Sequence, residues 1–204
     1  MITIIDYKAG NFKSIANMLK RLGVESCFTD DVETIKNAEK LILPGVGHFD
    51  FGMNNLKKSG LIPVLESKVL QDKIPILGIC LGAQLMTKNS EEGDVEGLGW
   101  VDAKTIKFTI DNLPKGYKVP HMGWTDVVAN KDSKLTENLP DAPRYYFVHS
   151  YYMECENSED VLFKSEYGHA FDAAFQHNNI YGVQFHPEKS HKFGMQLLKN
   201  FAEL

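Results

Sequence analysis

The stretch Ile76-Leu77-Gly78-Ile79-Cys80-Leu81-Gly82-Ala83-Gln84 decides the fold of this chain. Its first four residues form an apolar run of the length expected for a buried strand, and the residues after Cys80 are compatible with a helix. A cysteine with glycine two residues before and two after it, at a strand-to-helix junction, is the thiol counterpart of the nucleophile elbow. The glycines relieve crowding at the sharp turn, and the start of the helix lends partial positive charge to a thiolate. The stretch therefore predicts an α/β fold with a cysteine placed for acyl transfer.

The sequence before this stretch alternates strand-like and helix-like segments, which indicates βαβ units and a parallel sheet. Asp30 or Asp31 is expected to cap the second helix. The expected elements are strands at 2–5, 24–28, 41–43 and 76–79, the third stopped by Pro44, and helices over 12–22 (ended by Gly23), after 31, 49–57 and 61–72.

The sequence after this stretch is richer in strand-like runs and closes with an amphipathic helix. We therefore expect an open, mostly parallel twisted sheet flanked by helices, with extra antiparallel strands in the second half, in a single domain over 1–204. The expected strands are 101–108, 125–128, 145–148, 161–167, 173–176 and 180–185, and the closing helix uses Phe193, Leu197, Leu198 and Phe201.

Composition and charge exclude several classes of protein. The net charge is −5 and no block of lysine and arginine occurs, which argues against nucleic-acid binding. The first residues lack the basic region of a signal peptide, and no apolar run reaches the roughly 18 residues that a membrane span needs. An odd number of cysteines, Cys27, Cys80 and Cys155, does not suggest a disulfide framework. We therefore expect a cytoplasmic protein with no membrane contact.

A thiol nucleophile needs a base, and His186-Pro187-Glu188 at the end of an apolar strand supplies a candidate. Residues i and i+2 of an extended chain point the same way, and we expect Pro187 to hold the backbone extended. Glu188 would then reach one imidazole nitrogen of His186 while the other nitrogen faces the thiol.

The reaction also needs an oxyanion hole. The amide of Leu81, which follows the nucleophile, is one expected donor. A second is expected from the loop Pro44-Gly45-Val46-Gly47, since the carboxyl ends of parallel strands share one edge of a sheet. A rotation at Val46 would aim its N–H at the developing charge.

These three pieces, in this order and spacing, resemble the class I (triad-type) glutamine amidotransferases over nearly the whole chain. The set of local motifs also resembles the glutaminase subunits of imidazole glycerol phosphate synthase and their close paralogues. The motifs are Asp6-Tyr7-Lys8-Ala9-Gly10-Asn11, Pro44-Gly45-Val46-Gly47, Pro120-His121-Met122-Gly123-Trp124, His149-Ser150-Tyr151 and His186-Pro187-Glu188-Lys189-Ser190.

The resemblance implies a flavodoxin-like fold and hydrolysis of glutamine to glutamate and ammonia. Cys80 is expected to attack the side-chain amide, His186 to protonate the departing ammonia, and water to release glutamate from a γ-glutamyl thioester. Glu92 carries a charge suited to the ammonium group of the substrate. The positions that match the family's glutamine-binding residues are Gly47, Gln84, Glu92, Ser150 and Tyr151.

Ammonia that meets bulk water is lost as ammonium, so such a glutaminase is expected to dock on a synthase. The family partner is a (βα)₈-barrel cyclase of histidine biosynthesis, which receives ammonia through an internal channel of the heterodimer. Asn11, His121 and Trp124 are the candidates for the docking face and channel mouth, with 120–124 expected as an exposed loop. An ordinary core position for Trp124 is the alternative.

Three residues depart from the family pattern, and none belongs to the expected triad. Lys8 stands where the family usually has glycine, Thr125 where it has asparagine, and Ala83 where methionine is frequent. Two of the three lie in motifs expected to face the partner. An alternative is therefore a paralogous glutaminase whose cyclase-like partner supplies a sugar N-amidotransferase of surface-glycan biosynthesis, a branch that Met86-Thr87-Lys88 and Gly99-Trp100 also resemble.

Other classes fit the sequence less well. A stand-alone thiol hydrolase would lack the glutamine-pocket residues, and a non-catalytic binding module would usually have lost a member of the triad. No cofactor is expected. No metal site is expected either, because the spacing of the histidines in the second half of the chain suits no compact ligand set. The histidines considered are His169, His177, His186 and His191.

Overall fold

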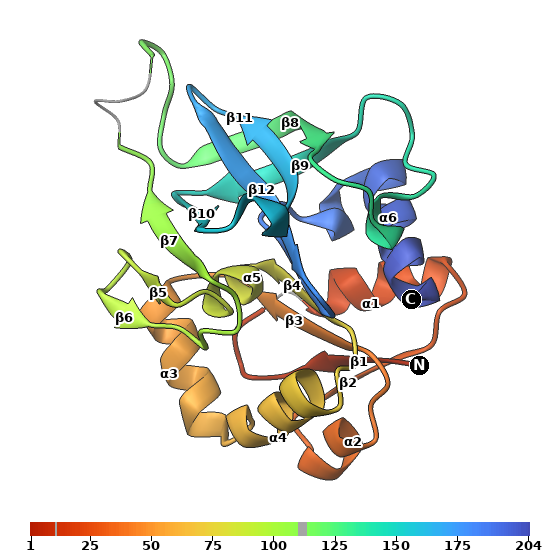
Figure 1. The fold of residues 1–204 in the computed structure, drawn as a ribbon. Coiled ribbons are helices and arrows are strands. Elements are labelled where there is room, and N and C mark those ends of the chain that lie inside the picture. The colour runs from red at the N-terminus through yellow and green to blue at the C-terminus, as the bar shows by residue number, and fades with distance from the viewer. Residues whose placement is uncertain (11, 110–113) are drawn as a thin grey trace.

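The computed structural model describes residues 1–10, 12–109 and 114–204. The strands of these residues form one 13-stranded sheet with a parallel half and an antiparallel half. Figure 1 shows the parallel half, most of it from the first part of the chain, below most of the antiparallel half. This arrangement confirms the mixed α/β fold expected from the sequence.

The parallel half is built around the stretch that carries Cys80. Its strands follow the order β2-β1-β3-β4-β13, which is the flavodoxin-like order. In such a sheet, ligands bind outside the carboxyl ends of the strands. The strands are β1 (Ile2–Ile5), β2 (Ser26–Thr29), β3 (Leu41–Gly45), β4 (Ile76–Cys80) and β13 (Ile180–Val183).

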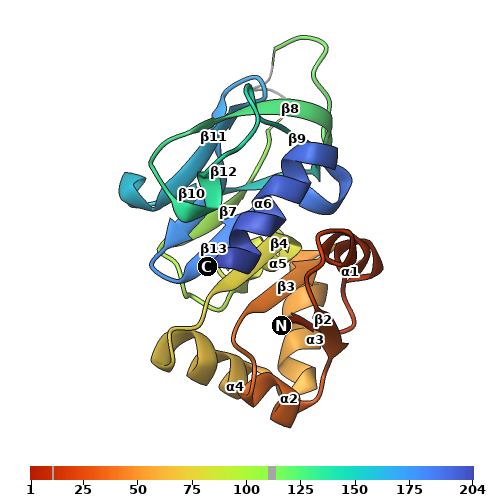
Figure 2. The same cartoon turned by 90° about the vertical axis from the view of Figure 1, so that its right-hand side faces the viewer.

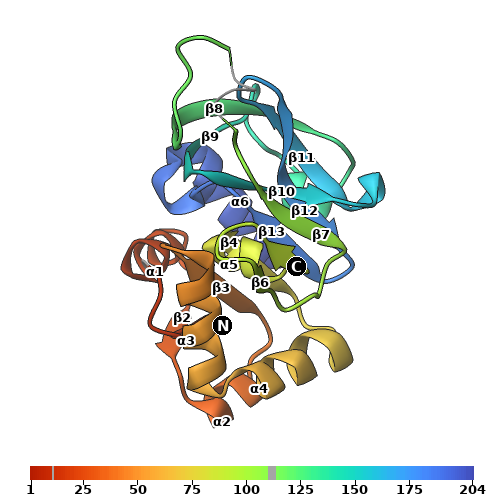
Figure 3. The ribbon, with the colours of Figure 1, turned by 90° about the vertical axis from the view of Figure 1, so that its left-hand side faces the viewer.

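Helices cover both faces of the parallel half, each burying apolar side chains against it. Helices α1 (Phe12–Arg21) and α6 (His191–Glu203) pack on one face and contact each other. Helices α2 (Val32–Lys36), α3 (Phe49–Ser59) and α4 (Ile62–Glu66) pack on the other. Figure 2 shows α1 and α6 on the side that faces the viewer. Figure 3, from the opposite side, shows α3 and α4 in front.

The antiparallel half joins the parallel half where β12 pairs with β13. From β12 the sheet continues through β10 and β7 to the short β5 and β6, and branches through β11 to β8 and β9. These strands are β5 (Asn89–Ser90), β6 (Val95–Glu96), β7 (Ala103–Lys107), β8 (His121–Ala129), β9 (Arg144–His149), β10 (Tyr151–Cys155), β11 (Val161–Glu166) and β12 (Ala170–His177).

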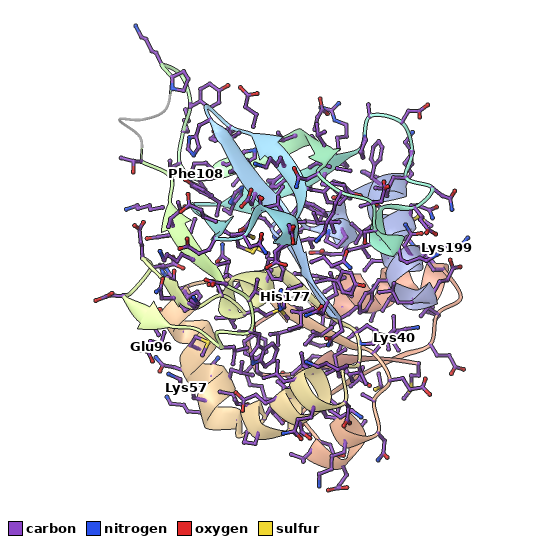
Figure 4. The ribbon with its side chains drawn as sticks, viewed as in Figure 1. Lys40, Lys57, Glu96, Phe108, His177 and Lys199 are labelled. Atoms are coloured by element: carbon purple, nitrogen blue, oxygen red, sulfur yellow. The ribbon has the colours of Figure 1, made fainter. Side chains whose placement is uncertain are left out.

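Several helix boundaries follow local signals in the sequence. Gly23, at φ 73°, ends α1, and the N–H of Val24 donates to the carbonyl of Leu19 in the pattern of a Schellman cap. Asp31 caps α2 by accepting from the N–H of Thr34 at 2.7 Å. Far along the chain, Lys40 donates to the carbonyl of Ala202 at 2.6 Å and ties the start of β3 to the end of α6 (Figure 4).

Four expectations about elements were wrong. Strand β3 runs through Pro44 to Gly45, because its pairing with β1 ends at Ile42 and Pro44 has no β1 partner to donate to. The 61–72 helix is α-helical only as far as Glu66 and continues as a π-helical segment over Ser67–Gln71. The expected strand 180–185 ends at Val183.

The fourth concerns the segment 120–124, which is not a loop from His121 onward. Residues 121–124 pair with β9 as the first part of β8, so their backbone groups are held by the ladder.

Strand β10 was not expected from the sequence at all. Ser150 interrupts the extended chain between β9 and β10, so β9 pairs with β8 while β10 pairs with β7 and β12.

Candidate active site

Cys80 is the last residue of β4, and helix α5 (Leu81–Leu85) begins directly after it. Its backbone lies at φ 53° and ψ −114°, which non-glycine residues rarely adopt. Strained backbone of this kind persists only where the surrounding structure holds it. The junction is therefore a strained elbow, as the sequence predicts.

The glycines around Cys80 are required because two elements meet at the elbow. A Cβ at Gly78 would lie 2.6 Å from the Cα of Ala83, and a Cβ at Gly82 would collide with the carbonyl oxygen of Leu43 in β3. The first turn of α5 therefore packs directly on β3 and β4.

A pocket of about 370 Å³ opens beside Cys80. It lies beyond the carboxyl ends of β3 and β4 and is closed on the other side by the β9–β10 connection. The lining includes nine of the candidate residues from the sequence: Val46, Gly47, Cys80, Leu81, Gln84, Glu92, Ser150, Tyr151 and His186.

His186 and Glu188 form a buried pair behind the pocket. The Nδ1 of His186 lies 2.8 Å from the Oε1 of Glu188, and each side chain is 2% exposed. The geometry differs from the extended one expected, because Pro187–Lys189 forms a 3₁₀ turn. The Nε2 of His186 has no hydrogen-bond partner among the described residues and is the nitrogen left to serve the thiol.

The protonation of His186 is set by opposing effects. Burial lowers the pKa of its imidazole, but the neighbouring Cys80 and Glu188 outweigh burial and raise the pKa to about 10. His186 is therefore held as an imidazolium at neutral pH, which favours its pairing with a thiolate at Cys80.

The two expected oxyanion donors, Leu81 and Val46, both line the pocket. Leu81 is the first residue of α5, so its N–H has no partner within that helix. Val46 lines the pocket from the end of β3, with its residue 43% exposed, and Gly47 after it sits at φ 105°. Glycine removes the steric barrier to a rotation of this loop.

The residues expected to bind glutamine have partners within the chain. Glu92 accepts from the N–H of Phe49 at 2.8 Å, at the start of α3, and lies 3.1 Å from His48. Gln84 is buried and its Nε2 donates to the carbonyl of Tyr151 at 3.1 Å. Ser150 lies between the two strands that close the pocket.

The residues expected at the docking face separate into three cases. Asn11 lies outside the described residues. His121 is 2% exposed and its Nδ1 lies 2.9 Å from the Nε2 of His149, so its side chain is not exposed on the surface. Trp124 is 38% exposed on β8, next to the exposed Met122 by alternation of the strand, and stacks on the ring of His191.

Two of the departures from the family pattern have a structural explanation. Lys8 sits at φ 64°, where glycine is favoured, and its Nζ contacts Asp6 at 2.7 Å and Asp30 at 3.0 Å. These contacts hold a lysine in a left-handed backbone conformation. The hydroxyl of Thr125 lies 2.8 Å from the Nε2 of His121.

Two buried polar residues of this site were given no role in the sequence analysis, although His149 stands in one of the motifs. His149 also lines the pocket, and Gln184 lies against Cys80, with its Nε2 3.8 Å from the sulfur. A signal for Gln184 exists in the sequence, since it is a polar residue inside the apolar run 180–185.

Among the described residues, no group of three or more His, Cys, Asp or Glu could hold a metal ion. The helices described include none long and apolar enough to cross a membrane.

Comparison with known proteins gives the family. A family model described as glutamine amidotransferase class-I matches residues 3–204. The chain is 54% identical to imidazole glycerol phosphate synthase subunit HisH 2 of Methanococcus maripaludis over 203 residues, which cover 100% of this chain and 99% of that protein. It is 49% identical to the protein of the same name from Pseudomonas aeruginosa over 204 residues, which cover both chains fully.

A solved structure described as a glutamine amidotransferase has a TM-score of 0.76 at 19% identity and covers 100% of both chains, which shows the shared fold. The alternative was a paralogous glutaminase that supplies ammonia for a sugar N-amidotransferase. The names of the sequence relatives do not support it. By sequence and by fold, this chain belongs to the class-I glutamine amidotransferases.

Proposed function

We propose that this chain is the glutaminase subunit of an imidazole glycerol phosphate synthase. The observation that carries the proposal is the pocket beside Cys80. A cysteine on a strained turn faces the buried His186–Glu188 pair there, and the candidate glutamine-binding residues line the same space. The names of relatives 49–54% identical over the whole chain support the histidine pathway.

The first step forms a thioester. The Cys80 thiolate attacks the side-chain amide carbon of glutamine, and the N–H groups of Leu81 and Val46 stabilise the oxyanion. Imidazolium at His186 then gives its proton to the departing nitrogen, so ammonia leaves as the C–N bond breaks. Glu188 holds the tautomer of His186 that presents Nε2 to this reaction.

The second step restores the enzyme. His186, now neutral, takes a proton from water as the oxygen attacks the γ-glutamyl thioester, and glutamate leaves with the thiolate regenerated. Gly47, Gln84, Glu92, Ser150 and Tyr151 hold the substrate, with the carboxylate of Glu92 facing its ammonium group. Glu92 also binds the first N–H of α3, which orients the carboxylate before the substrate arrives.

The ammonia is passed to a (βα)₈-barrel cyclase subunit, which forms a heterodimer with this chain. Trp124 and the neighbouring Met122 present an exposed apolar surface on β8 that suits such a partner. Asn11 stays a candidate on the docking face. The chain works as one glutamine amidotransferase unit over 1–204, and its three free cysteines suit the reducing cytoplasm.

Two experiments test the proposal. The chain should restore growth without histidine to a strain that lacks this subunit, whereas failure to grow with an active glutaminase would contradict the pathway. In the complex, Cys80→Ala should abolish synthesis from glutamine and leave synthesis from added ammonium intact. Glutamine-dependent turnover by the Cys80→Ala complex would remove Cys80 from the nucleophile's role. Cys155→Ala is the matched control and should keep both activities.

A further inference from the structure

A buried chain of hydrogen bonds reaches the sulfur of Cys80. The Nε2 of Gln84 donates to the carbonyl of Tyr151 at 3.1 Å and to the Oε1 of Gln184 at 3.0 Å. The Nε2 of Gln184 in turn donates to the Sγ of Cys80 at 3.8 Å. Gln184 is fully buried and Gln84 nearly so, so water does not compete for these bonds.

The direction of every bond in this chain follows from one group. The carbonyl of Tyr151 can only accept, so the atom of Gln84 that faces it must be the NH₂ group. The second hydrogen of that group needs an acceptor, which makes the facing atom of Gln184 its oxygen. The remaining NH₂ group of Gln184 therefore points at Cys80.

The same carbonyl is also bonded to the buried His149, which in turn is bonded to the buried His121. The Nδ1 of His149 lies 2.7 Å from the Tyr151 oxygen and must donate to it, so the Nε2 of His149 accepts from the Nδ1 of His121 at 2.9 Å. The Nε2 of His121 then accepts from the hydroxyl of Thr125 at 2.8 Å. Burial lowers the pKa of His121 to about 4 and that of His149 to about 3, so both are neutral at pH 7 with one tautomer each.

Gln184 is also held by its backbone. Its N–H donates to the carbonyl of Ala173 at 2.9 Å, and it precedes His186 by two residues. The segment directly after β13 therefore brings two side chains toward the same sulfur, an imidazole from His186 and an amide from Gln184.

We propose that Gln184 is a catalytic residue that donates a hydrogen bond to the Cys80 thiolate, with Gln84 and the carbonyl of Tyr151 as the groups that orient it. The inference rests on the proposed function in that Cys80 is taken as the nucleophile. A thiolate is a stronger acceptor than a thiol, so the bond favours the charged, reactive form. Both Nε2 hydrogens of Gln84 are occupied by this chain, which leaves the Oε1 of Gln84 to meet the substrate.

The test measures the reactivity of Cys80 without using glutamine. The full chain is treated with iodoacetamide at pH 7, and the alkylation rate of each cysteine is followed by peptide mass. Gln184→Met keeps the length of the side chain and removes the donor, so alkylation of Cys80 should slow about ten-fold, as expected for the loss of one charge-assisted hydrogen bond. The rates at Cys27 and Cys155 should not change, because both cysteines lie outside the pocket.

A matched control makes the same change elsewhere. Gln196 lies on α6 and donates to Asn200 at 2.8 Å, so Gln196→Met should leave the rate at Cys80 unaltered. A Cys80 rate within two-fold of wild type in Gln184→Met, with Cys27 and Cys155 unchanged, would overturn the proposal.

A second variant decides the case in which Gln184→Met loosens the fold and all three cysteines react faster. Gln84→Met keeps Gln184 and removes the group that orients it, so Cys80 should again slow while Cys27 and Cys155 keep their rates. An unchanged Cys80 rate there would also overturn the proposal. Since the Cys80→Ala experiment measures turnover of glutamine and this one measures alkylation, failure of the proposed function and failure of the role of Gln184 give different results.

Discussion

Gly45, at the end of β3, pairs in register with Cys80, at the end of β4. The hydroxyl of Tyr7 and the N–H of Gly82 both approach Gly45 so closely that a Cβ there would lie 2.5 Å from the first and 2.6 Å from the second. The loop expected to supply an oxyanion donor therefore starts from a residue clamped against the first turn of α5.

Gly45→Ala should lower the free energy of unfolding by about 1–3 kcal/mol, because the added methyl group must displace backbone and not only a flexible side chain. Urea unfolding measures this loss. Gly23→Ala is the comparison, since its Cβ would meet nothing within 4 Å and only the positive φ opposes it. A smaller loss at Gly45 than at Gly23 would contradict the clamp.

His186 should make stability depend on pH on the alkaline side. Its pKa is raised from the ordinary value of 6.5 to about 10 in the fold, so the folded protein binds the proton more tightly. The resulting stabilisation is complete below pH 6.5 and is lost as the pH rises through about 10. Unfolding of wild type and His186→Gln at several pH values should give curves that converge over this range. A constant difference between the two curves would show that the imidazolium is not held.

The buried His121 should make the free energy of unfolding depend on pH at acidic pH. Burial lowers its pKa to about 4, so the unfolded chain binds the proton more tightly and stability falls as the pH drops from 6.5 toward 4. His121→Phe keeps an aromatic ring against Tyr167 and Phe147 and should flatten this fall between pH 7 and pH 5. Equal slopes in wild type and His121→Phe would refute the assignment.

The hydroxyl of Tyr7 is buried without a hydrogen-bond partner among the described residues. Removing such a group ends its desolvation cost, so Tyr7→Phe should leave stability unchanged or raise it by up to about 1 kcal/mol. Tyr167→Phe provides the contrast, because that hydroxyl donates to the carbonyl of Lys118 at 2.8 Å, and its loss should cost about 1 kcal/mol. The thermal unfolding temperature should therefore be unchanged or higher in Tyr7→Phe and lower in Tyr167→Phe. A large loss of stability in Tyr7→Phe would reveal a partner for its hydroxyl.

Trp124→Ala should weaken binding of the proposed cyclase partner about ten-fold or more, since a large aromatic side chain at the centre of an interface carries much of its energy. Val128→Ala removes a more exposed apolar side chain farther along the same strand and should have little effect. Titration of the partner by calorimetry measures both. Equal affinities for wild type and Trp124→Ala would remove this part of β8 from the docking surface.

Local patterns were sufficient for the elbow and for the alternation of strands and helices in the first part of the chain. The apolar run before Cys80, the contact of Gly78 with Ala83 and the cap at Asp31 act within a few residues, so their effects can be read along the chain. The same patterns failed at Pro44 and at 121–124, where the pairing partner decided whether the segment is a strand.

The strained turn at Cys80 could be predicted from the sequence, because the strand, the turn residue and the helix that follows are consecutive in the chain. Only the tertiary structure decided which polar groups meet there. Gln184 lies 104 residues from Cys80 and 100 from Gln84, and the direction of its amide depends on the carbonyl of Tyr151. From the sequence alone, the side-chain amides of Gln84 and Gln184 could each donate or accept a hydrogen bond. Burial removes water as an alternative partner, and the one group that can only accept then sets the direction of all the bonds.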